Sequence, residues 1–357
     1  MKTKKVFILA YARQNLGDDL FIYMLLNKYP NIQFYINIEK KEHAKLFESL
    51  KNVTIYQSTG RKLKKDNVDE YDAYIYIGGS IFMEGIGSNY TISEELLDFM
   101  KECKKQNIPF HYVSSNFGPY HTEEYLNLSK EVFKNCSSIY FRDKYSAELF
   151  KGVDTVHYAP DLVFSYLPEK IEKKENSIGI SIIDLSIRAK LKEYIENYYG
   201  MLVNNIKEYI KQNKNVTLFS FCKHEGDEEA IEELIKRFPN NLKENINIVK
   251  YNSDIKWFLK EYAKMEYMIC SRFHGMILSV IMNQKCKILS YSDKIDNVIN
   301  DLELFKKNEI LHMDEIQDDI NILLETFRQV DESKVEEIRK KATLQLSEVD
   351  RTLKFMM

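Results

Sequence analysis

The chain has 357 residues, of which 44% are hydrophobic and 29% are charged. This composition and length are typical of a folded protein with two domains of ~150 to 200 residues, and they exclude a disordered chain. The net charge of −3 excludes a general positive field for nucleic acid, but it leaves open a local basic pocket for a small anion.

The first ten residues look like the start of a signal peptide, but their apolar run is short and no small-residue cleavage site follows. We therefore expect a buried first strand there. No stretch approaches the ~20 apolar residues that a membrane span needs. The five cysteines form no CxxC pair, which indicates buried, reduced thiols in the cytoplasm and argues against disulfides and a cysteine zinc site.

Short β-branched or aromatic runs alternate with longer amphipathic segments. This alternation is typical of a mostly parallel sheet covered on both faces, and it predicts a Rossmann-like domain over residues 1–167. One of the helical segments opens with a capping-box sequence at 91–94. The predicted strands of this domain are Val6–Tyr11, Ile32–Ile38, Val53–Tyr56, Ala73–Ile77, His111–Ser114, Ser138–Phe141 and Val156–Tyr158.

The charged segment 168–176 begins with proline and lacks apolar periodicity, so we interpret it as a linker. A second Rossmann-like domain follows over residues 177–331, with a long helical stretch between Ser186 and Asn213. The predicted strands of this domain are Ser177–Ile183, Val216–Phe221, Ile246–Lys250, Tyr267–Cys270, Cys286–Leu289 and Glu309–Leu311.

Residues 332–357 form a single amphipathic pattern that predicts a C-terminal helix closing the structure. The fold class is therefore α/β, with two doubly wound domains facing a cleft. In such sheets, ligands bind beyond the carboxyl ends of the strands. The positions expected to be buried on the closing helix are Val335, Ile338, Ala342, Leu344 and Leu346.

Arg272 and His274 lie on a turn between an apolar strand that ends at Cys270 and a helix that begins after Gly275. The free N–H groups at the start of that helix favour an anion. Arg272 adds a charged fork suited to carboxylate or phosphate, and His274 is a natural proton donor near neutral pH. The alternative is a surface ion pair of Arg272 beside a helix-capping His274.

A second candidate segment begins with Asn15 and opens a helix after the first strand. Gly17 would let the backbone approach a ligand, and Asp18 or Asp19 would cap the helix or accept hydrogen bonds from sugar hydroxyls. Helix capping alone explains the segment more simply. It is neither a GxGxxG motif nor a Walker motif.

Two further strand ends carry polar residues. Gly78, Gly79 and Ser80 follow one strand, where glycines let backbone amides face a ligand closely, although a tight turn explains them nearly as well. Arg142 ends another strand and would project into the cleft from the first domain. The competing interpretation is a structural pair of Arg142 with Asp143 on the rim.

Lys294 follows a strand end in the second domain and would place a positive charge on a phosphate, although an isolated lysine is usually a solvated surface residue. The histidines His43, His121 and His312 have neither the HExxH spacing nor any paired ligand spacing. We therefore expect no metal site.

Taken in order, these segments resemble the polysaccharide pyruvyl transferase family. The resemblance covers nearly the whole two-domain body, and the Arg-Phe-His-Gly turn is its most telling part. The matching segments are Asn15-Leu16-Gly17-Asp18-Asp19, Gly78-Gly79-Ser80, Asn116-Phe117-Gly118-Pro119, Phe141-Arg142-Asp143-Lys144-Tyr145-Ser146, Pro160-Asp161, Ser271-Arg272-Phe273-His274-Gly275 and Tyr291-Ser292-Asp293-Lys294.

The resemblance implies a GT-B-like fold, phosphoenolpyruvate as the donor substrate and a pyruvate ketal formed on two hydroxyls of a sugar in a polysaccharide or glycolipid precursor. It implies that Arg142, Arg272 and Lys294 bind the donor and that His274 is the general acid. A further family arginine lies upstream of the glycine pair, where Arg61 is the nearest candidate. No metal or redox cofactor is required. Candidates for acceptor or loop contacts are Asn15, Gly17, Asp18, Gly78, Gly79 and Ser80.

Two departures from the family pattern affect the acceptor side: Ser80 replaces the last glycine of a triplet, and Tyr120 follows Gly118-Pro119 in place of an aliphatic residue. The acceptor sugar, its linkage and the oligomeric state stay open. A lipid-linked acceptor would add peripheral contact with the inner membrane face to a cytoplasmic location.

Two other functions remain. A glycosyltransferase of the same fold would use a nucleotide-sugar donor and would need a carboxylate for the ribose or as a base, for which Asp227 or Glu225 is available. A non-catalytic relative would bind a glycan or an anion without turnover.

Overall fold

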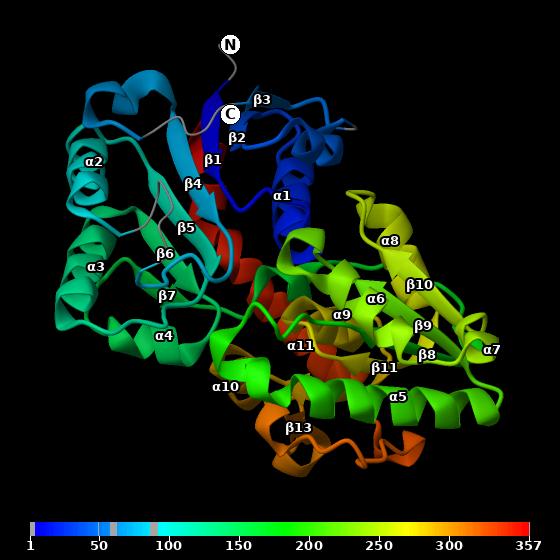
Figure 1. The fold of residues 1–357 in the computed structure, drawn as a ribbon. Helices are drawn as coiled ribbons and strands as arrows, with labels where there is room; N and C mark the ends of the chain where they lie inside the picture. The colour runs from blue at the N-terminus through cyan, green and yellow to red at the C-terminus, as the bar shows by residue number, and fades with distance from the viewer. Residues whose placement is uncertain (1–3, 49, 58–62, 86–91, 357) are drawn as a thin grey trace. The chain divides into compact units, whose positions relative to one another are not determined.

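The computed structural model describes residues 4–48, 50–57, 63–85 and 92–356 (Figure 1). Its internal contacts divide the chain into two compact units. Unit 1 comprises residues 1–13, 18–165 and 338–357, and unit 2 comprises residues 14–17 and 166–337. Two short segments therefore belong to a different unit from their neighbours in the sequence, an exchange that the sequence-based ranges did not include.

Unit 1 contains a seven-stranded parallel sheet with the strand order β3-β2-β1-β4-β5-β6-β7. The order reverses between β1 and β4, which makes the sheet doubly wound. Its strands are β1 (Lys5–Leu9), β2 (Gln33–Ile38), β3 (Val53–Gln57), β4 (Ala73–Ile77), β5 (Phe110–Ser115), β6 (Ser138–Phe141) and β7 (Val156–Tyr158).

Aromatic side chains join the sheet of unit 1 to its helices. The rings of Tyr74 on β4 and Phe99 on α2 meet edge to face with centroids 5.1 Å apart, and those of Tyr112 on β5 and Phe133 on α3 lie 6.0 Å apart. The helices α2 and α3 thus cover one face of the sheet (Figure 1). The helices are α1 (Leu16–Lys28), α2 (Glu94–Lys105), α3 (Glu123–Asn135) and α4 (Lys144–Leu149).

Unit 2 contains a six-stranded parallel sheet with the order β10-β9-β8-β11-β12-β13, which reverses between β8 and β11. Its strands are β8 (Lys174–Ser181), β9 (Asn215–Ser220), β10 (Ile246–Lys250), β11 (Met265–Cys270), β12 (Lys285–Ser290) and β13 (Ile310–His312). Its helices are α5 (Ile195–Lys211), α6 (Asp227–Lys236), α7 (Asn240–Lys243), α8 (Ile255–Ala263), α9 (Phe273–Ile281) and α10 (Asp293–Leu302).

Both faces of this second sheet are covered. Ile180 and Leu218 pack in one core cluster with Leu202 of α5. The ring of Phe219 points to the other face, where its centroid lies 5.7 Å from that of Phe258 and 4.9 Å from that of Tyr262, both on α8. The predicted α/β class with two doubly wound parallel sheets is confirmed.

All thirteen predicted strands are present, with ends that shift by a few residues. The largest shift is at β8, which begins at Lys174, so the last three residues of the predicted linker belong to this strand, with Lys174 paired to Met265. The helix α2 begins after Ser93, whose hydroxyl accepts from the backbone N–H of Leu96. This helix thus has a serine N-cap rather than a start at the predicted capping box.

The C-terminal segment is not one uninterrupted helix as predicted. A 3-10 turn, η9 (Thr343–Leu346), separates α11 (Glu332–Ala342) from α12 (Ser347–Met356). Because a 3-10 turn advances three residues per turn, it shifts the buried face, and Leu344 is 49% exposed rather than buried. Gln345 points inward instead, where its amide donates to the carbonyl of Ala159 (2.7 Å) and accepts from the N–H of Ser114 (2.8 Å).

The remaining four of the five expected C-terminal positions are buried, and all five cysteines are free and buried. These thiols act as small apolar side chains of the cores, as the sequence predicted. In the part of the chain that the structure describes, no helix combines the length and apolar character that crossing a bilayer requires.

Candidate active site

The polar loops of unit 2 gather where its strand order reverses. The strands β9, β8, β11 and β12 are consecutive neighbours in the sheet. The loops and first helical turns that follow their carboxyl ends carry Glu225 and Asp227, Arg188, Arg272, and Lys294. Ligands of doubly wound sheets bind at this edge, beside the reversal of strand order, so this is the candidate active site of unit 2.

Arg272 is the N-cap residue of α9 and is only 6% exposed. Its Nε donates to Oδ2 of Asp227 at 3.0 Å, and its Nη2 donates to the other oxygen of the same carboxylate. Its Nη1 donates to Oε2 of Glu225. The alternative of a surface ion pair is therefore wrong, because the guanidinium is buried between two carboxylates.

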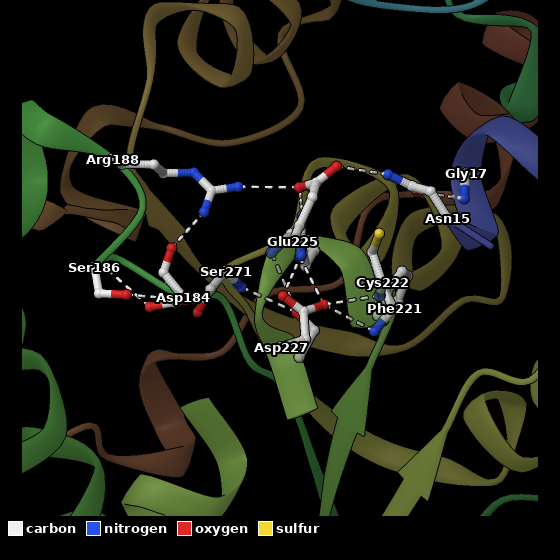
Figure 2. A network of polar contacts seen from close by, with 12 residues as sticks. Asn15, Gly17, Asp184, Ser186, Arg188, Phe221, Cys222, Glu225, Asp227 and Ser271 are labelled. Carbon is white, nitrogen blue, oxygen red and sulfur yellow. Dashed lines mark hydrogen bonds and ion pairs between the residues drawn. The ribbon is translucent and has the colours of Figure 1, made fainter. Parts of the chain in front are cut away.

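Asp227 is the fixed counter-ion of Arg272. Its side chain is 0% exposed and also accepts the backbone N–H groups of Phe221 (2.9 Å) and Cys222 (3.0 Å), as Figure 2 shows. Burial raises the pKa of Asp227 to about 6, against the opposing charge of Arg272. The carboxyl group is therefore mostly ionised at neutral pH and holds the guanidinium fork bidentately.

Glu225 is held differently, by donors from separate loops. In addition to Arg272, Nη2 of Arg188 donates to Oε2 at 3.1 Å, and Nδ2 of Asn15 donates to Oε1 at 2.9 Å (Figure 2). Burial would raise the pKa of Glu225, but the charges of Arg272, Arg188 and Lys294 lower it to about 2. Glu225 is thus an anion at every physiological pH.

Glycine at 226 is required by the turn that carries Glu225. Gly226 has φ +80°, and a Cβ atom there would lie 2.3 Å from Oδ2 of Asp184. Any side chain would therefore combine left-handed strain with a clash. The 3-10 turn η5 (Lys223–Glu225) and the start of α6 are fixed by this residue.

The segment 14–17 brings a second glycine to the site. The backbone N–H of Leu16 donates to the carbonyl of Phe221 at 3.0 Å, and the N–H of Gly17 donates to Oδ1 of Asn15 at 3.1 Å. A Cβ atom at Gly17 would lie 1.8 Å from Nδ1 of His274. The imidazole therefore lies directly against the glycine, and the structure brings Asn15, Gly17 and His274 together as part of one site.

Lys294 reaches the same group through aromatic neighbours. Its Nζ lies 5.3 Å from the ring centroid of Tyr291 and 6.0 Å from that of Phe273, whose ring meets His274 edge to face at 5.1 Å. The Cζ of Arg188 lies 5.5 Å from the Tyr291 centroid. Burial would raise the pKa of Tyr291, but the charges of Lys294, Arg272 and Arg188 lower it below 10.0.

Arg188 and Tyr291 were not among the candidate residues from the sequence. Tyr291 stands in the strand-end motif that already singled out Lys294, so its position was visible. Arg188 lies seven residues beyond the last residue of β8 without a motif. Only the fold shows that its guanidinium turns toward Glu225.

Unit 1 has its own buried arginine. Arg142 is 3% exposed, and it donates from Nη1 to Oδ2 of Asp161 at 2.9 Å and from Nη2 to Oδ1 of Asn116 at 2.6 Å. The hydroxyl of Ser80 donates to the same amide oxygen at 3.1 Å. A Cβ atom at Gly79 would lie 2.5 Å from Nη1 of Arg142, so the guanidinium packs on this glycine.

Other candidates of unit 1 adjoin this group. Asp143 caps α4 by accepting from the N–H of Ser146 at 2.8 Å. A Cβ atom at Gly78 would lie 3.9 Å from Oδ1 of Asp18, which places this carboxylate beside the glycine pair. Arg61 lies outside the described residues. The predicted meeting of Arg142 with Arg272 in one cleft stays a prediction.

Solved structures share this fold. The UDP-GlcNAc 2-epimerase of Methanocaldococcus jannaschii is similar at 12% identity and a TM-score of 0.55, over 95% of this chain and 92% of that one. Anabaena HepE in complex with UDP is similar at 10% identity and a TM-score of 0.52, over 96% of this chain and 93% of that one. The S. aureus MnaA–UDP structure is similar at 12% identity and a TM-score of 0.52, over 81% of this chain and 79% of that one. The class of protein is thus a two-domain α/β protein of the GT-B type.

The sequence gives the family within that class. Residues 15–293 match the family model described as polysaccharide pyruvyl transferase. The match covers most of the chain and includes all of the candidate site residues described above except Lys294. The chain belongs to the polysaccharide pyruvyl transferase family and is therefore a transferase.

Proposed function

We propose that this protein transfers the enolpyruvyl-derived group of phosphoenolpyruvate to two hydroxyls of a sugar and forms a pyruvate ketal. The observation that carries the proposal is the placement of His274 against Gly17, beside the cationic loops at the strand reversal of unit 2. Phosphoenolpyruvate has a carboxylate and a phosphate, and Arg188, Arg272 and Lys294 supply positive charge for both.

In the proposed reaction, His274 donates a proton to the methylene carbon of the donor, which leaves an oxocarbenium-like centre at the neighbouring carbon. One sugar hydroxyl adds to this centre and loses its proton, and the second hydroxyl then replaces the phosphate. The products are the ketal and inorganic phosphate; of the two hydroxyl protons, one restores His274 and the other leaves with the phosphate. A positioned acid of this kind contributes typically about 100- to 10,000-fold in rate, and the cations stabilise the charge of the departing phosphate.

The contacts of the two carboxylates favour this reaction over a glycosyl transfer. A nucleotide-sugar enzyme would need Asp227 or Glu225 for the donor ribose or as a base. Asp227 is wholly buried and accepts from Arg272 and two backbone N–H groups. Glu225 accepts from two arginines and one amide. Asp227 is therefore closed to a donor ribose, and Glu225, whose pKa the neighbouring cations lower to about 2, is a weak base suited to pairing with cations.

Mass spectrometry tests the reaction. A sugar acceptor incubated with the protein and phosphoenolpyruvate is expected to gain the mass of one ketal, with release of phosphate. His274→Ala should lose turnover while donor binding, followed by calorimetry, survives. His157→Ala is the matched control, since His157 belongs to unit 1, where its ring stacks on that of Tyr140 with centroids 4.7 Å apart.

Binding of a nucleotide sugar without binding of phosphoenolpyruvate would reject the proposal in favour of a glycosyltransferase. Donor binding without turnover on any acceptor, in wild type as in His274→Ala, would instead indicate a non-catalytic relative. The proposed chemistry needs neither a metal nor a redox cofactor, so we expect turnover to be unchanged after treatment with EDTA.

We propose further that the enzyme acts in the cytoplasm on a lipid-linked precursor at the inner membrane face. The first acceptors to compare are a lipid-linked oligosaccharide and the same sugar without the lipid. Equal turnover of both would contradict a role for the lipid.

A further inference from the structure

The carboxylate of Glu225 is held by the protein in the way that a bound oxyanion ligand is held. Its two oxygens accept hydrogen bonds from Asn15, Arg188 and Arg272, which come from three loops that are distant in the sequence (Figure 2 shows the first two). Two guanidinium groups and an amide converging on one carboxylate is the arrangement by which proteins bind carboxylate and phosphate ligands.

The comparison with Asp227 shows that the two carboxylates of this site are held with different firmness. Asp227 is 0% exposed and is fixed by backbone N–H groups. The side chain of Glu225 is 27% exposed, and among the described residues it accepts only from side chains. It is also longer and more flexible by one rotatable bond. Glu225 can therefore leave its position while Asp227 still neutralises and orients Arg272.

We propose that Asn15, Arg188 and Arg272 form an oxyanion subsite of the donor, and that Glu225 fills this subsite until a carboxylate or phosphate of the donor displaces it. Once Glu225 is displaced, Arg188 and Asn15 contact the donor substrate directly. The identity of the donor rests on the proposed function, whereas the subsite itself requires only an oxyanion.

A displaceable carboxylate has a physical advantage in this place. Without an anion between them, Arg188 and Arg272 would repel each other and lose their orientation in a poorly solvated loop cluster. Glu225 keeps both groups paired and prealigned, so the donor meets an ordered site. Its return would also help to expel the phosphate product.

The test measures binding of inorganic phosphate, pyruvate and phosphoenolpyruvate by calorimetry at one fixed salt concentration. Glu225→Ala removes the competing carboxylate and is expected to tighten binding by about tenfold, the value of one charged hydrogen bond. Adding Arg188→Ala to this variant should abolish the gain. Glu228→Gln is the control, because Glu228 pairs with Lys250 at 2.9 Å and should leave the affinities at wild-type values.

The probes distinguish the two parts of the donor. A gain for pyruvate alone assigns the subsite to the carboxylate, and a gain for phosphate alone assigns it to the phosphate. Unchanged or weaker binding of all three probes to a folded Glu225→Ala protein, verified by its melting curve, would overturn the proposal. So would a gain that persists in the double variant, because the added affinity would then not depend on Arg188.

These results are separable from those on the reaction itself. If Glu225→Ala tightens phosphate binding but the wild type forms no ketal, the subsite stands and the proposed function fails. If the wild type forms the ketal but Glu225→Ala binds no anion more tightly, the function stands and the displacement fails.

Discussion

Arg142 in unit 1 and Arg272 in unit 2 are both buried and occupy similar positions between a strand and a helix, but their hydrogen-bond partners differ. Each comes directly or nearly directly after a parallel strand and before a helix. Arg142 donates to one carboxylate and one amide, and its partner Asp161 is fully buried. Arg272 donates to two carboxylates, one of which is shared with a second arginine and partly exposed.

This difference indicates how a cation can be kept in place and still serve a ligand. The pair of Arg142 with Asp161 has no partly exposed carboxylate that a solute could replace. Around Arg272, two carboxylates have different roles. Asp227 holds the guanidinium in place, and Glu225 occupies the side where hydrogen-bond donors of other loops also point. The predictions below test this contrast, beginning with the largest expected effect.

Replacing Arg142 by Met tests how much the buried pair of Arg142 with Asp161 contributes to stability. The variant leaves the carboxylate of Asp161 buried without its counter-ion, which should lower the free energy of unfolding by about 3–5 kcal/mol. Urea denaturation followed by circular dichroism measures the loss. The double variant Arg142→Met/Asp161→Leu should recover most of it, and a double variant as unstable as the single one would show that the pair is not the cause.

The pH dependence of stability should identify Asp227 as the buried member of the second group. Its pKa of about 6 lies above the 3.8 of an unfolded chain, so between these pH values the folded state holds a proton that the unfolded state has lost. The free energy of unfolding should therefore fall as the pH rises through this window, by up to about 3 kcal/mol relative to Asp227→Asn. A wild type that instead gains stability over the variant with rising pH would show that hydrogen bonds outweigh burial.

Gly17→Ala should distinguish the role of the His274 imidazole in turnover from the role of the arginines in donor binding. The new Cβ would overlap His274, so we expect the ring to move and turnover to fall by about 100-fold, the lower end for loss of a positioned acid. Donor affinity, measured by calorimetry, should change little because the arginines are untouched. Normal turnover in this variant would exclude the observed position of His274 from the reaction.

Lys294→Gln should give the smallest effect. Removing this charge leaves Arg272 and Arg188 near Tyr291, so the pKa of the phenol should rise toward its ordinary value without reaching the level that burial alone would set. Carbon NMR of protein labelled at tyrosine Cζ follows the titration, with Tyr291→Phe to assign the signal. A pKa that does not move would mean that Lys294 is too distant or too hydrated to act.

The sequence predicted the strands well and the partners of the arginines poorly, for a physical reason. Buried strands carry their signal locally, in β-branched and aromatic runs. The partner of Arg142 is 19 residues away and that of Arg272 is 45 residues away, so they are joined only by the order of strands in the sheet. Gly17 was noted for its missing side chain, but the reason for it becomes visible only with the imidazole of His274 above it.

The same limit explains the errors at the C-terminus. Leu344 fits a helical apolar pattern, and nothing local marks the 3-10 turn that exposes it. The turn is held from outside, by the bonds of Gln345 to the chain near Ala159 and Ser114. Contacts between distant segments thus override a regular pattern.

The exchange of segments between the two units affects how the protein can be made. Unit 2 needs residues 14–17 from the beginning of the chain, and unit 1 needs residues 338–357 from its end. Unit 1 is therefore complete only after residues 338–357 have been synthesised, and no uninterrupted fragment contains all of one unit without part of the other. Truncation at 166 or 338 would leave a core without its last helix, and such intermediates expose apolar surface to aggregation.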